Sequence, residues 1–364
     1  MLNKFIVSGL HGNKDIEIDF EPDLTVITGE NGCGKTTALK LMWYLLSPNI
    51  ERAYREIDFS EAFLQTDLFS ISFSKEKCHV VFNPGDSEAE MIIGGESEVC
   101  CDDNLDFMLS SRLSRGRTEF EFELELVNNS IRKLQSSSLF FPTYRRIEEN
   151  DRFSSEEMRR LSSAIRDYSQ RVSVDNHRLV ASVSTKDIKD LITSKYAELS
   201  EEALSLRGDL LNEIVLVITN TKKGNEGAAL KALATIRSDI ECAEGNQKEL
   251  FSSFDMMKEA VGHFMRDKAV RISNNICIGE INRVIGADKL SAGEKQILSF
   301  LAYNALYKDT PIIIDEPELS LHIDWQRELV PMLLGQETSN QIILATHSPF
   351  IYSKYPDKEI NLSR

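Results

Sequence analysis

Near its N-terminus the chain carries a glycine-rich turn followed at once by a lysine and a threonine, residue types that bind phosphate and metal ions. Gly29, Gly34, Lys35 and Thr36 have the spacing G-x-x-x-x-G-K-[ST]. Glycines allow successive backbone N–H groups to point at a phosphate, because no Cβ stands in the way. We expect Lys35 to reach the β- and γ-phosphates and Thr36 to hold Mg²⁺. The spacing therefore predicts a nucleotide-binding loop.

The segments on either side of this loop would position it. Residues 24–28 are apolar and predict a strand, and residues 36–46 predict a helix with one apolar face. This succession distinguishes a phosphate loop from an ordinary glycine-rich turn. The whole candidate loop comprises Gly29, Glu30, Asn31, Gly32, Cys33, Gly34, Lys35, Thr36 and Thr37.

The six cysteines have neither a C-x-x-C pair nor zinc-finger spacing, so we interpret all of them as free thiols. Within the loop, Cys33 is interpreted as a small side chain that faces away from the phosphates. A redox switch at Cys33 is the alternative.

Two carboxylates end a second apolar segment. Residues 311–315 predict a buried strand, with Asp315 as its last residue and Glu316 directly after it. At the carboxyl end of a parallel strand, Asp315 can hold Mg²⁺ through water, and Glu316 can orient and deprotonate an attacking water. The pair predicts the metal ligand and the general base of nucleotide hydrolysis.

Two further patterns carry polar side chains of interest. Residues 341–345 predict another buried strand, ending just before His347, whose imidazole can contact a γ-phosphate. A lone histidine is more often structural. Ser291 and Glu294 form a capping-box pattern at the start of a helix, with Gly293 between them. Taken alone, this pattern indicates a well-capped helix.

The elements that must hold these residues are β-rich at first. Strand patterns occur at residues 4–7, 16–20, 69–73 and 80–82. The first two form a β-rich entry before the phosphate loop. The strands at 69–73 and 80–82, with a turn at 83–86, predict an antiparallel side sheet within residues 68–127. Residues 119–127 alternate like a strand, but their Glu and Leu content also suits a helix, and both interpretations stay open.

A strand pattern at 139–141 leads to Arg145 and Arg146. Two arginines at a strand end could face phosphate, or they could form a surface salt-bridge pair, and the sequence favours neither.

Helical patterns dominate from residue 150 onwards, beginning with a capping box at 154–157. Gly224 and Gly227 are expected to break this block into arms, and a hairpin at 269–281 is expected to lead back. We therefore predict one head domain formed by residues 1–149 and 269–364, with a helical insertion at 150–268.

Charge and hydropathy limit the partners. The chain has 42 Lys and Arg residues against 58 Asp and Glu residues, which gives a net charge of −16. This disfavours a surface that binds nucleic acid throughout, although a local basic stripe stays open. No apolar run approaches the roughly 18 residues of a membrane span. The N-terminus leads into a strand rather than a signal peptide, so we expect a cytoplasmic protein with no membrane partner.

Taken together, the motifs resemble a known family. The phosphate loop is followed in order by residues 290–294 (Leu-Ser-Ala-Gly-Glu), 312–318 (Ile-Ile-Ile-Asp-Glu-Pro-Glu), 320–322 (Ser-Leu-His) and 345–349 (Ala-Thr-His-Ser-Pro). This order is similar to that of the ABC-type ATPase heads of the RecF, SMC and OLD (overcoming lysogenization defect) group. The resemblance implies an α/β fold, in which a P-loop ATPase head with an antiparallel side sheet and a helical insertion binds ATP and Mg²⁺.

The resemblance also implies how the site is completed. In this group two heads sandwich two ATP molecules, so Ser291 and Gly293 of one subunit, with Glu294 of the same signature, would meet nucleotide bound by the other. Residues 319–322 would be the D-loop, and His347 would be the switch histidine. A homodimer or higher homo-oligomer, joined head to tail through ATP, is the implied assembly.

Two features depart from the family pattern. The motif with a glutamine that senses Mg²⁺ is not identifiable, since Gln65 is a weak candidate and residues 141–146 occupy the corresponding strand end. In addition, only 364 − 347 = 17 residues follow His347, which leaves no room for the TOPRIM nuclease of OLD proteins. Any effector is therefore expected to be another polypeptide.

Residues 141–148 and 316–322 are similar to those of stand-alone ATPase subunits of bacterial anti-phage systems such as Septu and PARIS. The implied role is a nucleotide-driven sensor and scaffold that holds or releases a nuclease partner in antiviral defence. The alternative is a RecF-like clamp that binds DNA during repair. A transporter motor fits least well, because such motors lack the long insertion and usually carry Leu-Ser-Gly-Gly-Gln.

Overall fold

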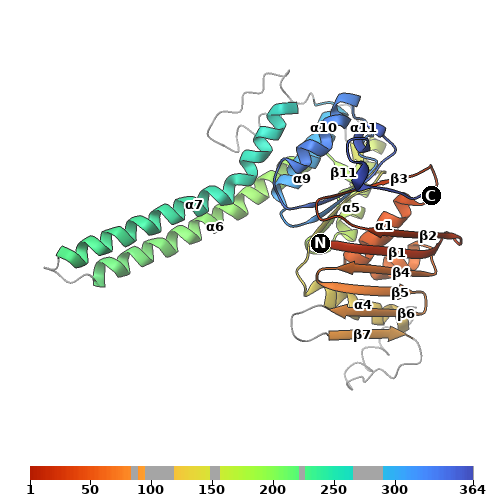
Figure 1. Ribbon diagram of the computed structural model, residues 1–364, viewed down its shortest axis with the longest axis horizontal. Helices are drawn as coiled ribbons and strands as arrows, with labels where there is room; N and C mark the ends of the chain where they lie inside the picture. Colours follow the sequence, from red (N-terminus) through yellow and green to blue (C-terminus); the bar gives the residue numbers. More distant parts are fainter. Residues whose placement is uncertain (83–88, 95–118, 148–155, 221–225, 265–289, 364) are drawn as a thin grey trace. The chain divides into compact units, whose positions relative to one another are not determined.

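The computed structural model describes residues 1–82, 89–94, 119–147, 156–220, 226–264 and 290–363. They divide into two compact units (Figure 1). Unit 1 contains Met1–Val183 and Tyr307–Arg364, and unit 2 contains Ser184–Leu306. The expected turn at 83–86, the capping residue Ser154 and the expected hairpin at 269–281 lie outside the described residues.

The boundaries between the two units along the chain differ from the expected boundaries at residues 150 and 268. Parallel pairing explains the first difference, because β10 (His177–Leu179) pairs with β8 (Ser138–Phe141), and β11 (Ser182–Val183) pairs with β9 (Arg146–Ile147). The helix α5 (Glu156–Val172) therefore connects strands of unit 1. At the second boundary, α9 (Ala292–Leu306) packs against the long helices of unit 2.

A six-stranded parallel sheet forms the centre of unit 1. Its strand order is β10-β8-β12-β13-β3-β14. The four further strands are β12 (Pro311–Asp315), β13 (Gln341–Ala345), β3 (Leu24–Thr28) and β14 (Glu359–Asn361). Every residue of β3, β12 and β13 is buried, as expected for parallel strands covered on both faces. Because all these strands run parallel, their carboxyl ends share one edge of the sheet.

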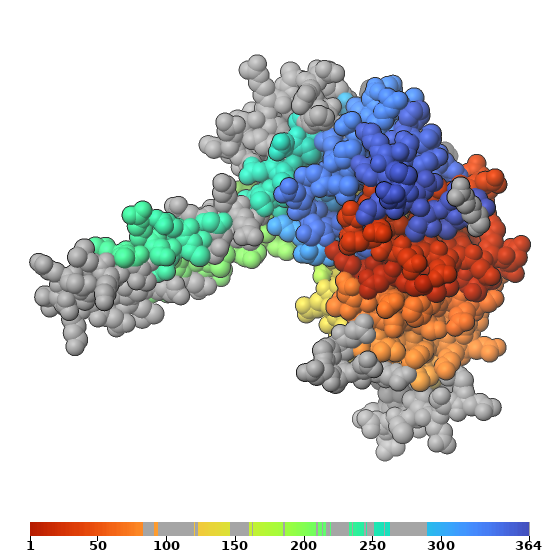
Figure 2. Space-filling view, viewed as in Figure 1, coloured from red at the N-terminus to blue at the C-terminus, as the bar shows by residue number. Residues whose placement is uncertain are grey.

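Helix α1 (Lys35–Leu46) lies between this sheet and a second one. It contacts β8 and β12 of the parallel sheet and β1 and β4 of the other. Both of its faces are therefore buried, including the large side chains of Trp43 and Tyr44. In the space-filling view, the red N-terminal segments lie directly against the blue C-terminal ones (Figure 2), as the pairing of β3 with β13 and β14 requires.

The second sheet of unit 1 is antiparallel, with the order β2-β1-β4-β5-β6-β7. Its strands are β1 (Leu2–Leu10), β2 (Lys14–Asp19), β4 (Glu61–Thr66), β5 (Phe69–Ser74), β6 (Lys77–Phe82) and β7 (Ala89–Gly94). The predicted side sheet is confirmed and also includes the first two strands of the chain. The short helix α2 (Ile50–Glu56) follows α1.

Residues 119–127, for which strand and helix were both open, form part of a helix, α4 (Glu119–Arg132). Leu124, Val127 and Ile131 are fully buried at helical spacing. Three short elements complete unit 1 after β12: α10 (Ile323–Leu334), α11 (Pro349–Tyr352) and the 3₁₀ turn η2 (Pro356–Lys358).

Unit 2 is helical. α6 (Thr185–Asn220) and α7 (Glu226–Phe264) lie side by side (Figure 1), and α9 packs against both. Gly227 lies inside the first turn of α7, so it does not break the helix as expected, and Gly224 lies outside the described residues. None of the helices in the described ranges is long and apolar enough to cross a membrane.

A buried histidine joins α1, β8 and β10. Trp43 Nε1 donates to Ser138 Oγ at 3.0 Å, and Ser138 Oγ lies 2.7 Å from His177 Nδ1. Burial lowers the pKa of His177 to about 4, against an opposing effect of Asp175. The imidazole is therefore neutral in the folded protein near pH 7.

This pKa predicts how stability depends on pH. The pKa of His177 in the folded protein lies below the ordinary value of 6.5. The contribution of the neutral imidazole to the free energy of unfolding is therefore complete above pH 6.5 and is lost as the pH falls towards 4. At 1.4 kcal/mol per pKa unit the loss is about 3 kcal/mol. In urea unfolding between pH 7 and 4.5, His177→Gln should flatten the decline, whereas His11→Gln, at an exposed position, should not. An unchanged slope in His177→Gln would contradict this assignment.

Candidate active site

The phosphate loop runs from β3 into α1, and its glycines are required by its geometry. Gly29 and Gly34 have φ of 148° and 106°, in the region that favours glycine. A Cβ on Gly29 would lie 2.9 Å from Cys33 Sγ, and one on Gly34 would lie 3.3 Å from Leu10 Cδ2. Gly34 is the N-cap of α1, so the N–H groups of the first helical turn border the loop. Such a helix start suits an anion.

Lys35 is buried, and its ammonium is surrounded by acceptors. Its Nζ donates to the carbonyl oxygens of Gly29 at 2.9 Å and Glu30 at 3.3 Å, and it lies 2.7 Å from Nε2 of His347. The Cys33 Sγ lies 3.8 Å from the same ammonium, so the thiol is not turned away from this lysine. The loop lysine and the histidine after β13 thus meet, although 312 residues separate them.

Neighbouring elements brace the loop with side chains that the sequence analysis did not identify. Lys14 Nζ donates to the Gly32 carbonyl, and His11 Nε2 lies 3.0 Å from Thr37 Oγ1. The Ser363 hydroxyl accepts from the Glu30 N–H at 2.6 Å. None of these residues belongs to a motif of its own, so only the pairing of strands brings them to the loop.

Asp315 ends β12 and is completely buried. Its Oδ2 accepts a hydrogen bond from the Thr143 hydroxyl, while no residue in the described ranges hydrogen-bonds its Oδ1. A buried carboxylate oxygen without a partner fits a cation ligand, and the Thr36 hydroxyl on α1 is the second expected ligand. No group of three His, Cys, Asp or Glu side chains that could hold a metal occurs among the described residues. Asp315 and Thr36 together would offer two oxygen ligands, and Mg²⁺ is a cation that takes its other ligands from water and phosphate oxygens.

Glu316 follows Asp315 in a left-handed backbone conformation, with φ of 50°. Its Oε1 lies 3.3 Å from His347 Nε2, and its N–H donates to the Ala345 carbonyl at 2.8 Å. Burial and the carboxylates of Glu318 and Asp315 raise its pKa to about 8, while Lys35 opposes this shift. Such a pKa suits a group that exchanges a proton near neutral pH.

Arg145 has a role that neither sequence interpretation included. It is buried, and its guanidinium donates to the backbone carbonyls of Asp315 at 2.5 Å, Glu316 at 2.7 Å and Pro142 at 3.1 Å. It therefore holds the backbone at the end of β12 instead of facing phosphate or forming a surface salt bridge. Burial lowers its pKa to about 10, and nearby carboxylates oppose the shift, Asp315 most strongly. The side chain of Arg146 is not among those that the structure describes.

Gln65 does not lie at this edge. It is exposed on β4 and paired with Lys4 at the beginning of β1. The other end of β1 lies beside the phosphate loop, since a Cβ on Gly34 would be 3.3 Å from Leu10 Cδ2. The strand end beside β12 instead supplies Thr143, which follows β8.

The remaining expected residues belong to both units and are described within each one. In unit 2, the Ser291 N–H donates to Glu294 Oε2 at 2.7 Å, and the Glu294 N–H donates to Ser291 Oγ at 3.3 Å. The predicted capping box at the start of α9 is thus confirmed, with Ser291 exposed and Gly293 buried. In unit 1, Leu319 and His322 of the expected D-loop are exposed. Asn31 and Gly32 of the phosphate loop are exposed as well.

Comparison with known proteins agrees with this geometry. The family model of the AAA ATPase domain matches residues 1–352. The "Retron Ec83 probable ATPase" of Escherichia coli is 30% identical over 117 residues, which cover 29% of this chain and 22% of that protein. A "DNA replication and repair protein RecF" of Desulfitobacterium hafniense is 49% identical over 43 residues, 12% of each. The chain thus spans less than a quarter of the length of either relative.

Among solved structures, the comparison finds an Smc head bound to the C-terminal winged-helix domain of ScpA. It is 13% identical, with 97% of this chain and 91% of that chain covered and a TM-score of 0.39. RecF with ATP is 11% identical, with 100% and 98% covered and a TM-score of 0.34. The expected α/β ATPase class is confirmed. Since the family model spans nearly the whole sequence, this chain belongs to the AAA ATPase domain family.

Proposed function

We propose that this protein binds and hydrolyses ATP with Mg²⁺ at the edge of the parallel sheet, and that ATP joins two copies head to tail. The observation that carries the proposal is the continuous contact from Lys35 through His347 to Glu316. Three segments that follow β3, β12 and β13 supply these side chains. An ammonium, an imidazole and a carboxylate at hydrogen-bond distance form a suitable set for phosphoryl transfer to water.

Each residue has a stated task in this proposal. Lys35 and the N–H groups of the phosphate loop bind the β- and γ-phosphates. Glu316 orients the attacking water and accepts its proton, and His347 contacts the γ-phosphate. Thr36 and Asp315 would hold Mg²⁺, which would supply positive charge to offset the negative charge of the phosphates.

The position of Glu316 depends on Arg145. A non-glycine residue with positive φ costs about 1–3 kcal/mol and persists where its surroundings hold it. Here the guanidinium of Arg145 donates to the carbonyls on both sides of the Glu316 N–H, and that N–H is itself bonded to Ala345. Three hydrogen bonds therefore stabilise the strained backbone at Glu316, two from Arg145 and one to Ala345.

The capping box of α9 supports a shared site. Ser291 is exposed, and Glu294 satisfies the Ser291 N–H, so the helix start is ordered before any partner arrives. The family resemblance implies that Ser291 and Gly293 meet the γ-phosphate held by another copy. Glu294 then has a local capping role.

For the wider role, we propose that ATP binding controls a separately encoded nuclease effector in anti-phage defence. The resemblance to stand-alone ATPases of Septu and PARIS supports this, and so does the match to a retron ATPase. The match to RecF favours the alternative, a clamp on DNA. Turnover stimulated by DNA would support the clamp, whereas co-purification of the product of an adjacent gene as a stoichiometric complex would support effector control.

The first prediction concerns Glu316. Glu316→Gln keeps the shape of the side chain but cannot accept the water proton, so hydrolysis should fall by about 10² or more, while ATP binding persists. Steady-state turnover and equilibrium binding of ATP measure the two quantities. If the variant fails to bind ATP, the division of roles between Asp315 and Glu316 is wrong.

The second prediction concerns Arg145. Arg145→Met removes a buried cation that is bonded to three carbonyls, so it should destabilise unit 1 by about 3–5 kcal/mol, because each buried acceptor left without a partner costs about 1–3 kcal/mol. Hydrolysis should fall with it, because Glu316 loses its backbone support. The matched control Arg132→Met, at an exposed position of α4, should change stability by about 0.5 kcal/mol or less. Equal stability of the two variants in urea unfolding would contradict the role given to Arg145.

The third prediction separates a shared site from a site within one chain. Ser291→Arg should leave ATP affinity near normal, because Lys35 is intact, and it should abolish association and hydrolysis. Mixing Ser291→Arg chains with Lys35→Ala chains, each inactive alone, should restore part of the hydrolysis, since one composite site then has an intact loop and an intact signature. If Ser291→Arg alone hydrolyses ATP at the parent rate, the site is not shared.

A further inference from the structure

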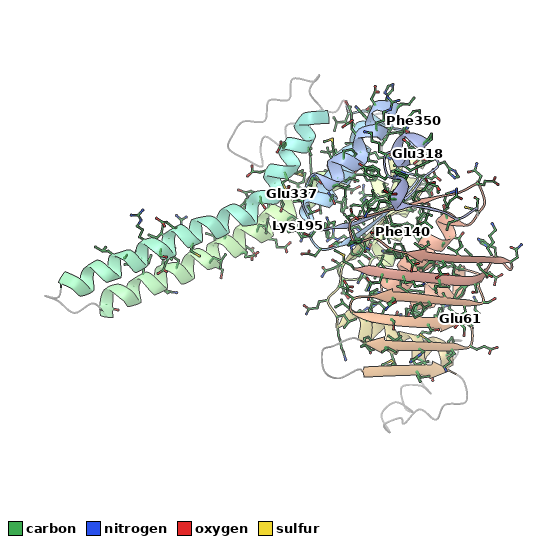
Figure 3. All side chains as sticks on the ribbon, in the orientation of Figure 1. Glu61, Phe140, Lys195, Glu318, Glu337 and Phe350 are labelled. Carbon is green, nitrogen blue, oxygen red and sulfur yellow. The ribbon has the colours of Figure 1, made fainter. Side chains whose placement is uncertain are left out.

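Glu318 lies two residues beyond the expected general base and makes a concentrated set of contacts (labelled in Figure 3). Its Oε1 accepts hydrogen bonds from the Thr346 hydroxyl at 2.7 Å, the His347 N–H at 2.8 Å and the Ser348 N–H at 3.0 Å. One carboxylate oxygen therefore holds three successive residues after β13. Two of these donors are backbone groups, so the contact fixes the path of the main chain at His347.

The imidazole of His347 is in turn the link between the loop lysine and the expected general base. Its Nε2 lies 2.7 Å from Lys35 Nζ and 3.3 Å from Glu316 Oε1. Glu318 reaches the backbone of His347, and no hydrogen bond joins Glu318 to the ring. Any effect of Glu318 on the ring is thus transmitted through the main chain.

A negative charge on Glu318 is unfavourable beside the Glu316 carboxyl, and the hydrogen bonds that Glu318 accepts compensate for this repulsion. The Glu318 carboxylate is one cause of the raised pKa of Glu316, because a nearby like charge disfavours ionisation of the Glu316 carboxyl. An acceptor for three donors is strongest when it is ionised, because hydrogen bonds to charged groups are roughly twice as strong as neutral ones.

We propose that Glu318 is a positioning residue for ATP hydrolysis, which fixes the switch histidine His347 between Lys35 and Glu316 through the backbone after β13. The inference rests on the proposed ATPase activity. It adds that a second carboxylate of the 312–318 motif, two residues after the expected general base, determines the placement of the histidine.

A double-mutant cycle with His347 tests the inference. Glu318→Gln should lower kcat about tenfold or more and leave the KM for ATP within about threefold, because the phosphate loop is untouched. In a His347→Ala background, the same substitution should have almost no further effect on kcat, since the residue through which it acts is gone. Glu328→Gln, an exposed carboxylate on α10, is the matched control and should retain the parent kcat.

Two results would overturn the inference: parent kcat in Glu318→Gln, or an equal loss of kcat with and without His347. If Glu318→Gln does not fold, Thr346→Val tests the same link, because it removes one of the three donors without changing charge or shape. Thr346→Val should also lower kcat, and its effect should also vanish in His347→Ala. An effect that persists there would overturn the inference as well.

A readout without turnover separates this inference from the proposed function. The chain contains six histidines, so ¹³Cε1 labelling gives a simple spectrum in which His347→Gln identifies the His347 signal. Without nucleotide, Glu318→Gln should shift that signal, and Glu328→Gln should not. If the parent protein fails to hydrolyse ATP but the signal shifts, the ATPase proposal fails and the positioning of His347 stands. An unshifted signal refutes the positioning.

Discussion

A buried ammonium needs acceptors on every side, and the environment of Lys35 meets that requirement with backbone carbonyls and one imidazole. Only a loop that folds back over the lysine side chain can present those carbonyls, which is why Gly29 and Gly34 must adopt conformations closed to other residues. The imidazole arrives from β13, so β13 must lie beside β3. The contact between Lys35 and His347 therefore depends on the parallel pairing of β3 with β13.

The same edge concentrates charge that burial would otherwise disfavour. Asp315, Glu316 and Glu318 lie within four residues of one another, and Arg145 is the cation that approaches their backbone. Because the guanidinium bonds carbonyls, the carboxylate oxygens stay available for metal, water and the donors of the loop after β13. Strain at Glu316 and the unpaired oxygen of Asp315 are the expected marks of a site arranged for a ligand.

Much of this arrangement could be predicted from the sequence. The phosphate loop, the strands before Asp315 and His347, and the Ser291–Glu294 cap carry strong local patterns, and each forms where expected. The element at 119–127 could not be decided, because its apolar residues alternate as in a strand while its Glu and Leu content suits a helix. In the fold this segment is the helix α4, which packs against β7 of the side sheet and against α2. Arg145 was misinterpreted for a related reason. From the sequence alone, a polar side chain at a strand end is expected to face solvent or phosphate. That Arg145 bonds backbone carbonyls at the end of β12 follows only when β12 is known to lie beside β8.

Calorimetric titration of ATP into the parent protein, Lys35→Ala and Lys133→Ala tests the central claim most directly. Lys133 is an exposed lysine and serves as the control. The claim predicts that the parent protein and Lys133→Ala bind one ATP per chain with equal affinity and that Lys35→Ala shows no binding, because its loop has lost the cation that neutralises the phosphates. Binding of ATP to Lys35→Ala with the parent affinity would contradict the assignment of this edge as the nucleotide site.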